Sequence, residues 1–278
     1  MALDVTPQLH RRPFGGWSAN MAYALGLFYA DGSISRPSRS WYVQFYNTDL
    51  AKVEWWHKFV EGTNPVHVRD NDRDNPLYSS RVTDDALGER LIRLGARPRK
   101  SVEDHPWPLM DDQFEPHFIR GFFDGDGGVW IGSAKKMKGG KILKVSLTCN
   151  APTFRRDLKN RVQRVVGKAG TVSETTIHLR LSGAAAEQFL AWLYGHEGPH
   201  MARKKAEWKK WCQFRKEHGG LIMDTDPYES LRGLREEPWH SLCYTHPVSE
   251  VVRRVRVSRS RVYQVRKALG IKEVRCGA

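Results

Sequence analysis

Two short apolar segments with the same pattern of small residues stand 95 positions apart in the chain. The first runs from Ala22 to Gly32 and the second from His117 to Gly127, and both contain Gly-[Leu/Phe]-Phe-x-[Ala/Gly]-Asp-Gly. Small residues return at every fourth position, which places them on one face of a helix. We therefore expect two helices that pack closely on these faces. Each is expected to end at its glycine in the left-handed conformation that this residue favours.

The residues after each apolar segment alternate between polar and apolar side chains, as in strands with one buried face. Such stretches are 41–47 and 145–150, and each leads into a helical stretch. Strand patterns at 78–83 and 176–182 follow in the same order, and each again precedes a helix. This ordered series predicts a duplicated unit of helix, two strands, helix, two strands and helix. The predicted fold class is α+β, with the first repeat at 1–105 and the second at 106–218.

The composition indicates a polyanionic partner. The chain has 278 residues, a formal net charge of +14 and a sequence pI near 9.8. Nucleic acid is favoured over an anionic membrane surface, because no basic amphipathic anchor is present. No stretch reaches the roughly 20 apolar residues of a membrane span. Four scattered cysteines without a C-x-x-C pair favour reduced thiols and an intracellular protein, in a microbe, a phage host or an organelle.

Half of the excess charge lies near the C-terminus. Residues 248–275 contain nine Lys or Arg and two Glu, which is 9 − 2 = +7. We expect a connector at 219–247 and a small all-α module at 248–278, where two short helices around a tight turn resemble a helix-turn-helix. Arg256 stands where that turn usually has glycine, so a basic helix lying on phosphates is the alternative. The candidate base readers in the second helix are Arg259, Ser260, Arg261 and Gln264.

The two aspartates at the ends of the repeated segments are the candidate chemical centre. Asp31 and Asp126 each directly follow the last small residue, so packing of the two helices brings the carboxylates together. Carboxylates a few ångströms apart repel, and either a proton or a cation must compensate. In a basic protein facing phosphates we favour Mg²⁺, whose preferred ligands are oxygens. The alternative is that both aspartates only form turns, as Asp-Gly pairs usually do.

At these residues the chain resembles the LAGLIDADG homing endonucleases that carry two motifs on one chain. The motif matches Ala24–Gly32 and Ile119–Gly127. The sixth position departs in the first copy, where Tyr29 replaces the aspartate that the second copy keeps as Asp124. The resemblance implies a pseudo-twofold pair of αββαββα repeats, whose antiparallel sheets form a saddle over double-stranded DNA. It also implies Mg²⁺-dependent cleavage of both strands at a long site, leaving short 3′ overhangs.

The resemblance also assigns roles to individual residues. Asp31 and Asp126, with Ala30 and Gly125 directly before them, would bind two or three shared Mg²⁺ ions, with Mn²⁺ as a substitute. Lys100 and Lys204 match the basic residue that approaches the scissile region late in each repeat. The expected DNA contacts, on strands, hairpin turns and strand ends, are Arg36, Arg39, Gln44, Tyr46, Asn47, Lys135, Lys136, Lys138, Lys141, Ser146, Thr148 and Asn150.

Two other functions are compatible with the same pattern. One is a catalytically inactive, LAGLIDADG-derived transcription regulator with a helix-turn-helix. Retention of both aspartates argues against it, because a pure binder has no need of paired metal-ligating acids. The other is an RNA maturase that assists intron splicing. The sequence implies a monomer without a protein partner, and it leaves open whether the gene is intron-encoded or stands free.

Overall fold

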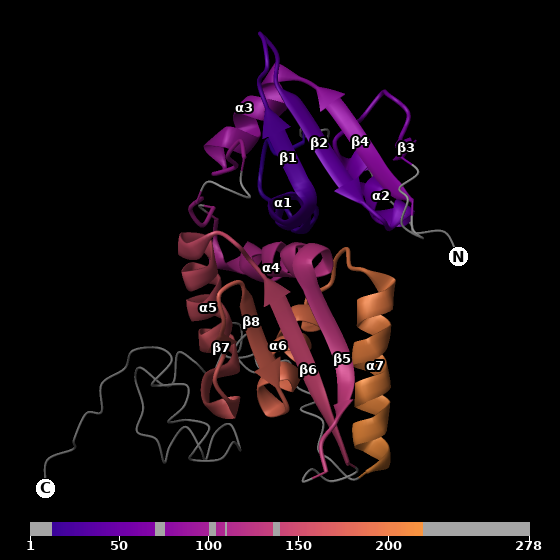
Figure 1. Ribbon diagram of the computed structural model, residues 1–278, viewed down its shortest axis with the longest axis vertical. Coiled ribbons are helices and arrows are strands. Elements are labelled where there is room, and N and C mark those ends of the chain that lie inside the picture. Colours follow the sequence, from indigo (N-terminus) through magenta and orange to yellow (C-terminus); the bar gives the residue numbers. More distant parts are fainter. Residues whose placement is uncertain (1–12, 70–75, 100–103, 109, 136–139, 219–278) are drawn as a thin grey trace, which may run out of the picture. The chain divides into compact units, whose positions relative to one another are not determined.

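The computed structural model describes residues 13–69, 76–99, 104–108, 110–135 and 140–218 (Figure 1). These residues all belong to the first of two compact units, Met1–Ile222. The predicted connector and C-terminal module therefore lie outside the described residues. The same holds for the individual candidates Lys100, Lys136, Lys138, Arg259, Ser260, Arg261 and Gln264.

The first repeat has the expected order of elements. In chain order it consists of α1 (Ala19–Asp31), β1 (Gly32–Ser35), β2 (Tyr42–Asn47), α2 (Leu50–Phe59), β3 (His67–Arg69), β4 (Leu77–Thr83) and α3 (Asp85–Arg93). Its four antiparallel strands are ordered β1-β2-β4-β3. The hydroxyl of Ser18 accepts a hydrogen bond from the Met21 amide at 3.1 Å, so this residue caps α1.

The second repeat has the same order, with one further helix. It consists of η1 (Asp112–Phe114), α4 (Glu115–Asp126), β5 (Gly127–Ser133), β6 (Lys141–Thr148), α5 (Pro152–Val166), η3 (Gly167–Ala169), β7 (Ser173–Glu174), β8 (His178–Ser182), α6 (Ala184–Gly195) and α7 (Ala202–Glu217). Its antiparallel sheet is ordered β5-β6-β8-β7, which matches the first sheet strand for strand. The α+β class and the tandem αββαββα arrangement are therefore confirmed.

Helices α1 and α4 pack directly against each other (Figure 1). At two glycines of this contact the backbones meet without a side chain between them. A Cβ atom on Gly26 would lie 2.0 Å from the carbonyl oxygen of Phe118, and one on Gly121 would lie 2.1 Å from that of Tyr23. Both obstacles are backbone atoms, which cannot move aside as a side chain can. The small residues at four-residue spacing thus form the contact face that the sequence predicts.

The expectation that Gly32 and Gly127 adopt the left-handed conformation is wrong. Gly32 has φ −83° and Gly127 has φ −101°, both in the extended region, because a strand begins directly at each residue. Glycine is required at both positions because there is no room for a Cβ atom. A Cβ atom would lie 2.1 Å from the Phe28 ring at Gly32, and 2.2 Å from the Phe123 ring at Gly127.

Strand register fixes how the two repeats correspond. Gly32 pairs with Phe45 in the first sheet, and Gly127 pairs with Leu147 in the second. The equivalent of Phe45 is therefore Leu147, and the equivalent of Asn47 is Cys149, one residue before Asn150. Asn150 follows the strand, but it does not occupy the position that Asn47 holds.

Each sheet has one buried face and one open face. Val43 and Phe45 of β2, and Val145 and Leu147 of β6, are buried against the helices of their own repeat. Side chains one position away point to the other face. On the open face of the first sheet, Gln44 pairs with Arg81; on that of the second, Ser146 pairs with Arg180.

Candidate functional site

The two motif aspartates are the last residues of the packed helices α1 and α4, so the helix contact brings their ends together. A Cβ atom on Gly125 would lie 2.2 Å from the Cβ of Ala30 and 3.1 Å from Oδ2 of Asp31. Asp31 therefore lies against the residue that precedes Asp126. Both aspartates are half-buried and directly precede the first residues of β1 and β5.

Asp31 is held by two side chains from its own repeat. The amide nitrogen of Asn47, at the end of β2, donates a 2.7 Å hydrogen bond to Oδ2 of Asp31. Nζ of Lys52, in the first turn of α2, lies 4.0 Å from the same oxygen. Part of the charge on this carboxylate is therefore compensated by the protein itself, in addition to any cation that binds there.

The surroundings of Asp126 differ, because the equivalent of Asn47 is Cys149. The Cys149 thiol is buried and donates to the carbonyl of Ala151 at 3.5 Å. Burial, with a smaller contribution from the negative charge of Asp126, raises the pKa of Cys149 to about 12. A neutral thiol is a weaker donor than an amide. The two halves of the site are therefore chemically unequal.

Two buried lysines meet at the C-terminal end of α4. Nζ of Lys204, in α7, donates to the main-chain carbonyls of Phe123, Asp124 (3.1 Å) and Gly127. Nζ of Lys52 donates to the same Asp124 carbonyl at 3.0 Å. Cations are favourable at this end of a helix, where carbonyl groups lack partners. Burial nevertheless lowers the pKa of both lysines, and that of Lys204 falls to about 8.

The sixth motif position has a structural role in both repeats. Asp124 is fully buried; its Oδ2 accepts from the hydroxyl of Tyr23 at 2.9 Å and from the amide of Met201 at 2.6 Å. The latter bond fixes the residue directly before α7, the helix that carries Lys204. In the first repeat, the hydroxyl of Tyr29 donates to the Leu94 carbonyl at 3.0 Å.

The substitution at Tyr29 belongs to a coordinated exchange of side chains. By the repeat correspondence, Tyr29 replaces Asp124 and Phe118 replaces Tyr23, while Phe154 stands where the first repeat has Lys52. Ring centroids of Tyr29 lie 5.3 Å from Phe118 and 5.4 Å from Phe154. An aromatic cluster in one half thus takes the place of a hydrogen-bonded polar cluster in the other.

The donor set at the helix ends fits a hard divalent cation. The two carboxylates and the carbonyls of Ala30 and Gly125 supply only oxygen atoms, the ligands that Mg²⁺ prefers. Within the described part of the chain, no group of three or more His, Cys, Asp or Glu side chains is placed to hold a metal. An ion here would therefore need further oxygen ligands, such as main-chain carbonyls, water or a substrate phosphate.

The remaining candidates lie on the open faces, hairpins and strand ends. Gln44 and Tyr46 share the open face of the first sheet, and Ser146 and Thr148 share that of the second. The Arg36 side chain donates two hydrogen bonds to the Arg39 carbonyl and lies over the Trp41 ring, with its Cζ 5.4 Å from the ring centroid. Lys135, Lys141 and Asn150 are exposed, and Nζ of Lys141 lies 4.9 Å from the centroid of the Phe214 ring.

Some residues in or beside the site escaped the sequence analysis. Lys52 sits in a helix between apolar residues and reads there as an ordinary surface lysine; only the tertiary contact reveals its position. Arg81 and Arg180 lie on strands that the sequence predicts. Their pairing with Gln44 and Ser146, which places them on the open faces, depends on strand register and is seen only in the structure. Trp130 is 43% exposed on the open face beside Lys144.

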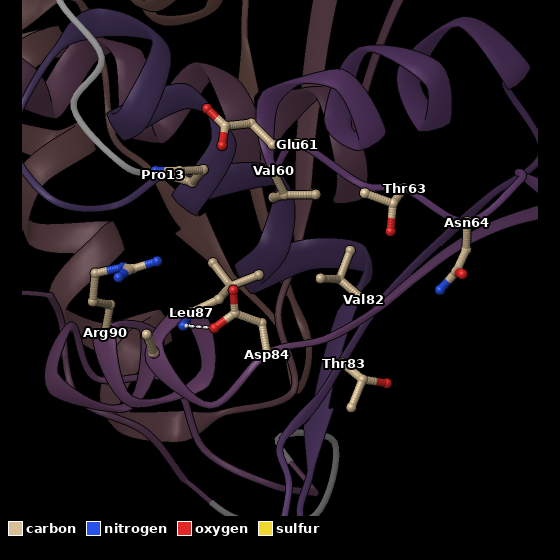
Figure 2. A pocket seen from close by; sticks show the side chains of 11 residues that line it. Pro13, Val60, Glu61, Thr63, Asn64, Val82, Thr83, Asp84, Leu87 and Arg90 are labelled. Atoms are coloured by element: carbon tan, nitrogen blue, oxygen red, sulfur yellow. Dashed lines mark hydrogen bonds between the residues drawn. The ribbon is translucent and has the colours of Figure 1, made fainter.

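A hollow of about 330 Å³ lies elsewhere in the first repeat (Figure 2). Its lining comes from the end of α2, the end of β4 and the start of α3, and includes Glu61, Asp84 and Arg90. Figure 2 shows Oδ1 of Asp84 accepting the Leu87 amide, at 2.8 Å, as the cap of α3. None of the predicted site residues lines this hollow, so it is separate from the paired aspartates.

Comparisons with solved structures give matches to LAGLIDADG homing endonucleases. The I-SmaMI enzyme bound to cleaved DNA is 14% identical, with a TM-score of 0.48 over 76% of this chain and 95% of that one. I-GzeII in complex with a DNA target is 12% identical, with a TM-score of 0.48 over 75% and 94%. I-WcaI bound to its recognition sequence is 13% identical, with a TM-score of 0.46 over 69% and 88%.

No protein-family model and no curated protein matches the chain. Its resemblance to the LAGLIDADG homing endonucleases therefore rests on its own residues and topology: two motif copies, their helix contact and two sheets of the same strand order. Among the helices of the described residues, none combines the length and apolar character that crossing a membrane requires.

Proposed function

We propose that the chain is a site-specific DNA endonuclease of the LAGLIDADG type, which hydrolyses phosphodiesters in both strands of a long asymmetric site. The single observation that supports this most is that Asp31 and Asp126 end two helices packed backbone to backbone, with Asp31 lying against Gly125. An arrangement that serves only to end helices has no need of two acids at one contact. Divalent metal, with Mg²⁺ preferred, and short 3′ overhangs are part of the proposal.

The open sheet faces support double-stranded DNA as the substrate. Each face presents polar and cationic side chains, including Gln44 and Arg81 on the first, and Lys144 and Arg180 on the second. Such side chains can reach base edges, while the excess of basic residues binds phosphates without regard to sequence. One chain carries both halves of the site, so we propose that it acts as a monomer.

The protein groups around the acids have distinct tasks in the reaction. Asn47 orients the Asp31 carboxylate, and Lys52 and Lys204 place positive charge beside the position of the scissile phosphates, where negative charge develops during hydrolysis. Asp124 holds Lys204 in place through the Met201 amide. Divalent ions held by Asp31 and Asp126 would activate the attacking water and stabilise the leaving oxygen.

The test is cleavage of a plasmid library with a randomised insert by the purified full-length chain. We expect linear products in Mg²⁺ that share one recognisable insert sequence, and none in EDTA. Sequencing both ends of the products gives the stagger between the two cuts, which we expect to be a short 3′ overhang.

Two other outcomes would overturn the proposal in different ways. Selective DNA binding without cleavage in Mg²⁺ or Mn²⁺ would favour the transcription regulator. Binding of structured RNA in preference to any duplex DNA would favour the maturase.

A further inference from the structure

Arg81 is held in place by a neighbour across the first sheet. It lies on β4 directly opposite Gln44 on β2, and both side chains belong to the open face. One orientation of the Gln44 amide satisfies all of its neighbours. Its carbonyl oxygen then accepts from Nε (2.5 Å) and Nη2 (2.8 Å) of Arg81, and its nitrogen donates to the Tyr46 hydroxyl at 2.6 Å.

This contact fixes the plane of the guanidinium while leaving one end of it available. An arginine side chain has five N–H donors. Nε and one N–H of Nη2 are directed at Gln44. Among the described residues, no partner is found for the two N–H groups of Nη1 and the second of Nη2. These donors form the end-on fork that can bind two acceptors side by side. Arg81 is an exposed residue, so the fork is accessible from the open face.

There is room beside Arg81 for the edge of a base. A hollow of about 260 Å³ is lined by Arg81 together with Tyr46, His67, Val68, Arg69, Leu77 and Ser79. It belongs entirely to β2, β3 and β4 of the first sheet. A base edge that enters this hollow lies next to the Arg81 side chain, and the neighbouring His67 and Arg69 add further donors.

The second sheet provides an internal comparison. Arg180 occupies the equivalent position on β8, but it lies opposite Ser146, whose side chain is too short to hold a guanidinium as Gln44 does. Among the described residues no hydrogen bond of the Arg180 side chain is found, although its main-chain carbonyl accepts from Ser173. One arginine is therefore oriented before binding and the other is not.

We propose that Arg81 reads a guanine in the major groove through its O6 and N7 atoms, and that Gln44 is a positioning residue for Arg81. Arginine bound in two places to O6 and N7 is the commonest specific contact to a base. Orientation before binding reduces the side-chain entropy lost on contact, which makes the contact more selective. The inference rests on the proposed function. It also changes the expected task of Gln44, from contacting a base to orienting Arg81.

The first experiment compares base preferences in the full-length chain. Duplex DNA with a randomised central segment is selected on wild type, Arg81→Ala, Gln44→Ala, Arg180→Ala and Ser146→Ala, in Ca²⁺. We expect wild type to require a guanine at one position, and Arg81→Ala to lose that preference there alone, by about tenfold or more. Gln44→Ala should weaken the preference at the same position. Arg180→Ala and Ser146→Ala lie on the second sheet, so neither should change the preference at the position that Arg81 reads.

The second experiment removes the acceptor from the DNA. The selected duplex is prepared with 7-deazaguanine at the position identified, which deletes N7 and keeps base pairing. Wild type should lose affinity for this duplex by several-fold, while Arg81→Ala should bind both duplexes equally. Such non-additivity is the signature of a direct contact.

The possible failures are distinguishable. If wild type selects a sequence, and Arg81→Ala weakens binding equally for all sequences, Arg81 contacts only phosphate and this inference is wrong while the proposed function stands. The inference is equally wrong if Gln44→Ala changes a different position from Arg81→Ala. If wild type selects no DNA sequence at all, the proposed function fails and this inference fails with it.

Discussion

Replacing Gly26 with alanine places a methyl group where helices α1 and α4 leave no room. The new Cβ would lie 2.0 Å from the Phe118 carbonyl oxygen, 2.7 Å from the Phe122 nitrogen and 3.0 Å from the Cα of Gly121. All three are backbone atoms of α4, so no change of rotamer relieves the overlap. The two helices must separate, and the ends that carry Asp31 and Asp126 must move with them.

The expected magnitude follows from two opposing contributions. Overpacking a well-packed contact costs about 1–3 kcal/mol, and a clash with backbone belongs at the upper end. Alanine in a helix interior is favoured over glycine by about 1 kcal/mol. The net loss is therefore about 2 kcal/mol, or a decrease in Tm of roughly 4–8 °C for a domain of this size.

Urea unfolding and thermal melting of Gly26→Ala measure this loss, with Gly132→Ala as the control. A Cβ on Gly132 would meet only the flexible end of the Lys144 side chain, at 3.2 Å, so its stability should be nearly unchanged. DNA cleavage by Gly26→Ala should also fall under conditions where the variant is fully folded. A variant at least as stable as wild type would refute the argument that the helices meet through their backbones.

Three further predictions concern the lysines and the C-terminal segment. First, Lys52→Met should slow the nicking of one DNA strand more than the other, because Phe154 stands at the equivalent position of the second repeat. Nicked circles should therefore accumulate in a plasmid assay. Equal slowing of both strands would contradict a chemical difference between the two halves of the site. Second, burial lowers the pKa of Lys204 to about 8 from an ordinary 10.5. Between these two pH values the unfolded state therefore binds more protons than the folded state. The free energy of unfolding contributed by Lys204 consequently rises with pH in this range. In urea titrations, the free energy of unfolding of wild type should rise relative to that of Lys204→Met between pH 8 and 10, by up to roughly 1.4 kcal/mol per pH unit. Parallel pH profiles of the two proteins would contradict the lowered pKa of Lys204. Third, ending the chain after Gly219 removes the basic residues at 248–275, which should weaken DNA binding and lower its salt dependence. An unchanged slope of log Kd against log salt concentration would contradict the predicted DNA-binding module.

The sequence predicts most helices and strands of this fold because the same local patterns of apolar, polar and small residues occur in both repeats, in the same order. The small-residue face of α1 and α4 and the strands β2 and β4 all follow from local pattern and are confirmed. Strands β3 (His67–Arg69) and β7 (Ser173–Glu174) are exposed along their whole length and only three and two residues long. Periodicity therefore cannot locate them, and only pairing with β4 and β8 defines them.

The candidate site is predicted only in part, because its second layer depends on contacts between elements far apart in the chain. Asp31 and Asp126 follow from the motif. Lys52 lies near Asp31 because α2 packs against the first sheet, and nothing in the local sequence signals that contact. The left-handed conformation expected at Gly32 and Gly127 is wrong because a strand begins directly at each residue, whereas many other helices end in a left-handed residue.

The most direct test of the account is the behaviour of Asp31→Asn and Asp126→Asn on the DNA sequence that wild type selects. Each variant keeps the size of the side chain and removes its negative charge, with Asp112→Asn, at an exposed position of η1, as the matched control. We predict that both variants bind the duplex with a Kd equal to or below that of wild type, and that neither cuts either strand in Mg²⁺. Undiminished cleavage by either variant would contradict the assignment of the paired acids as the metal-binding centre.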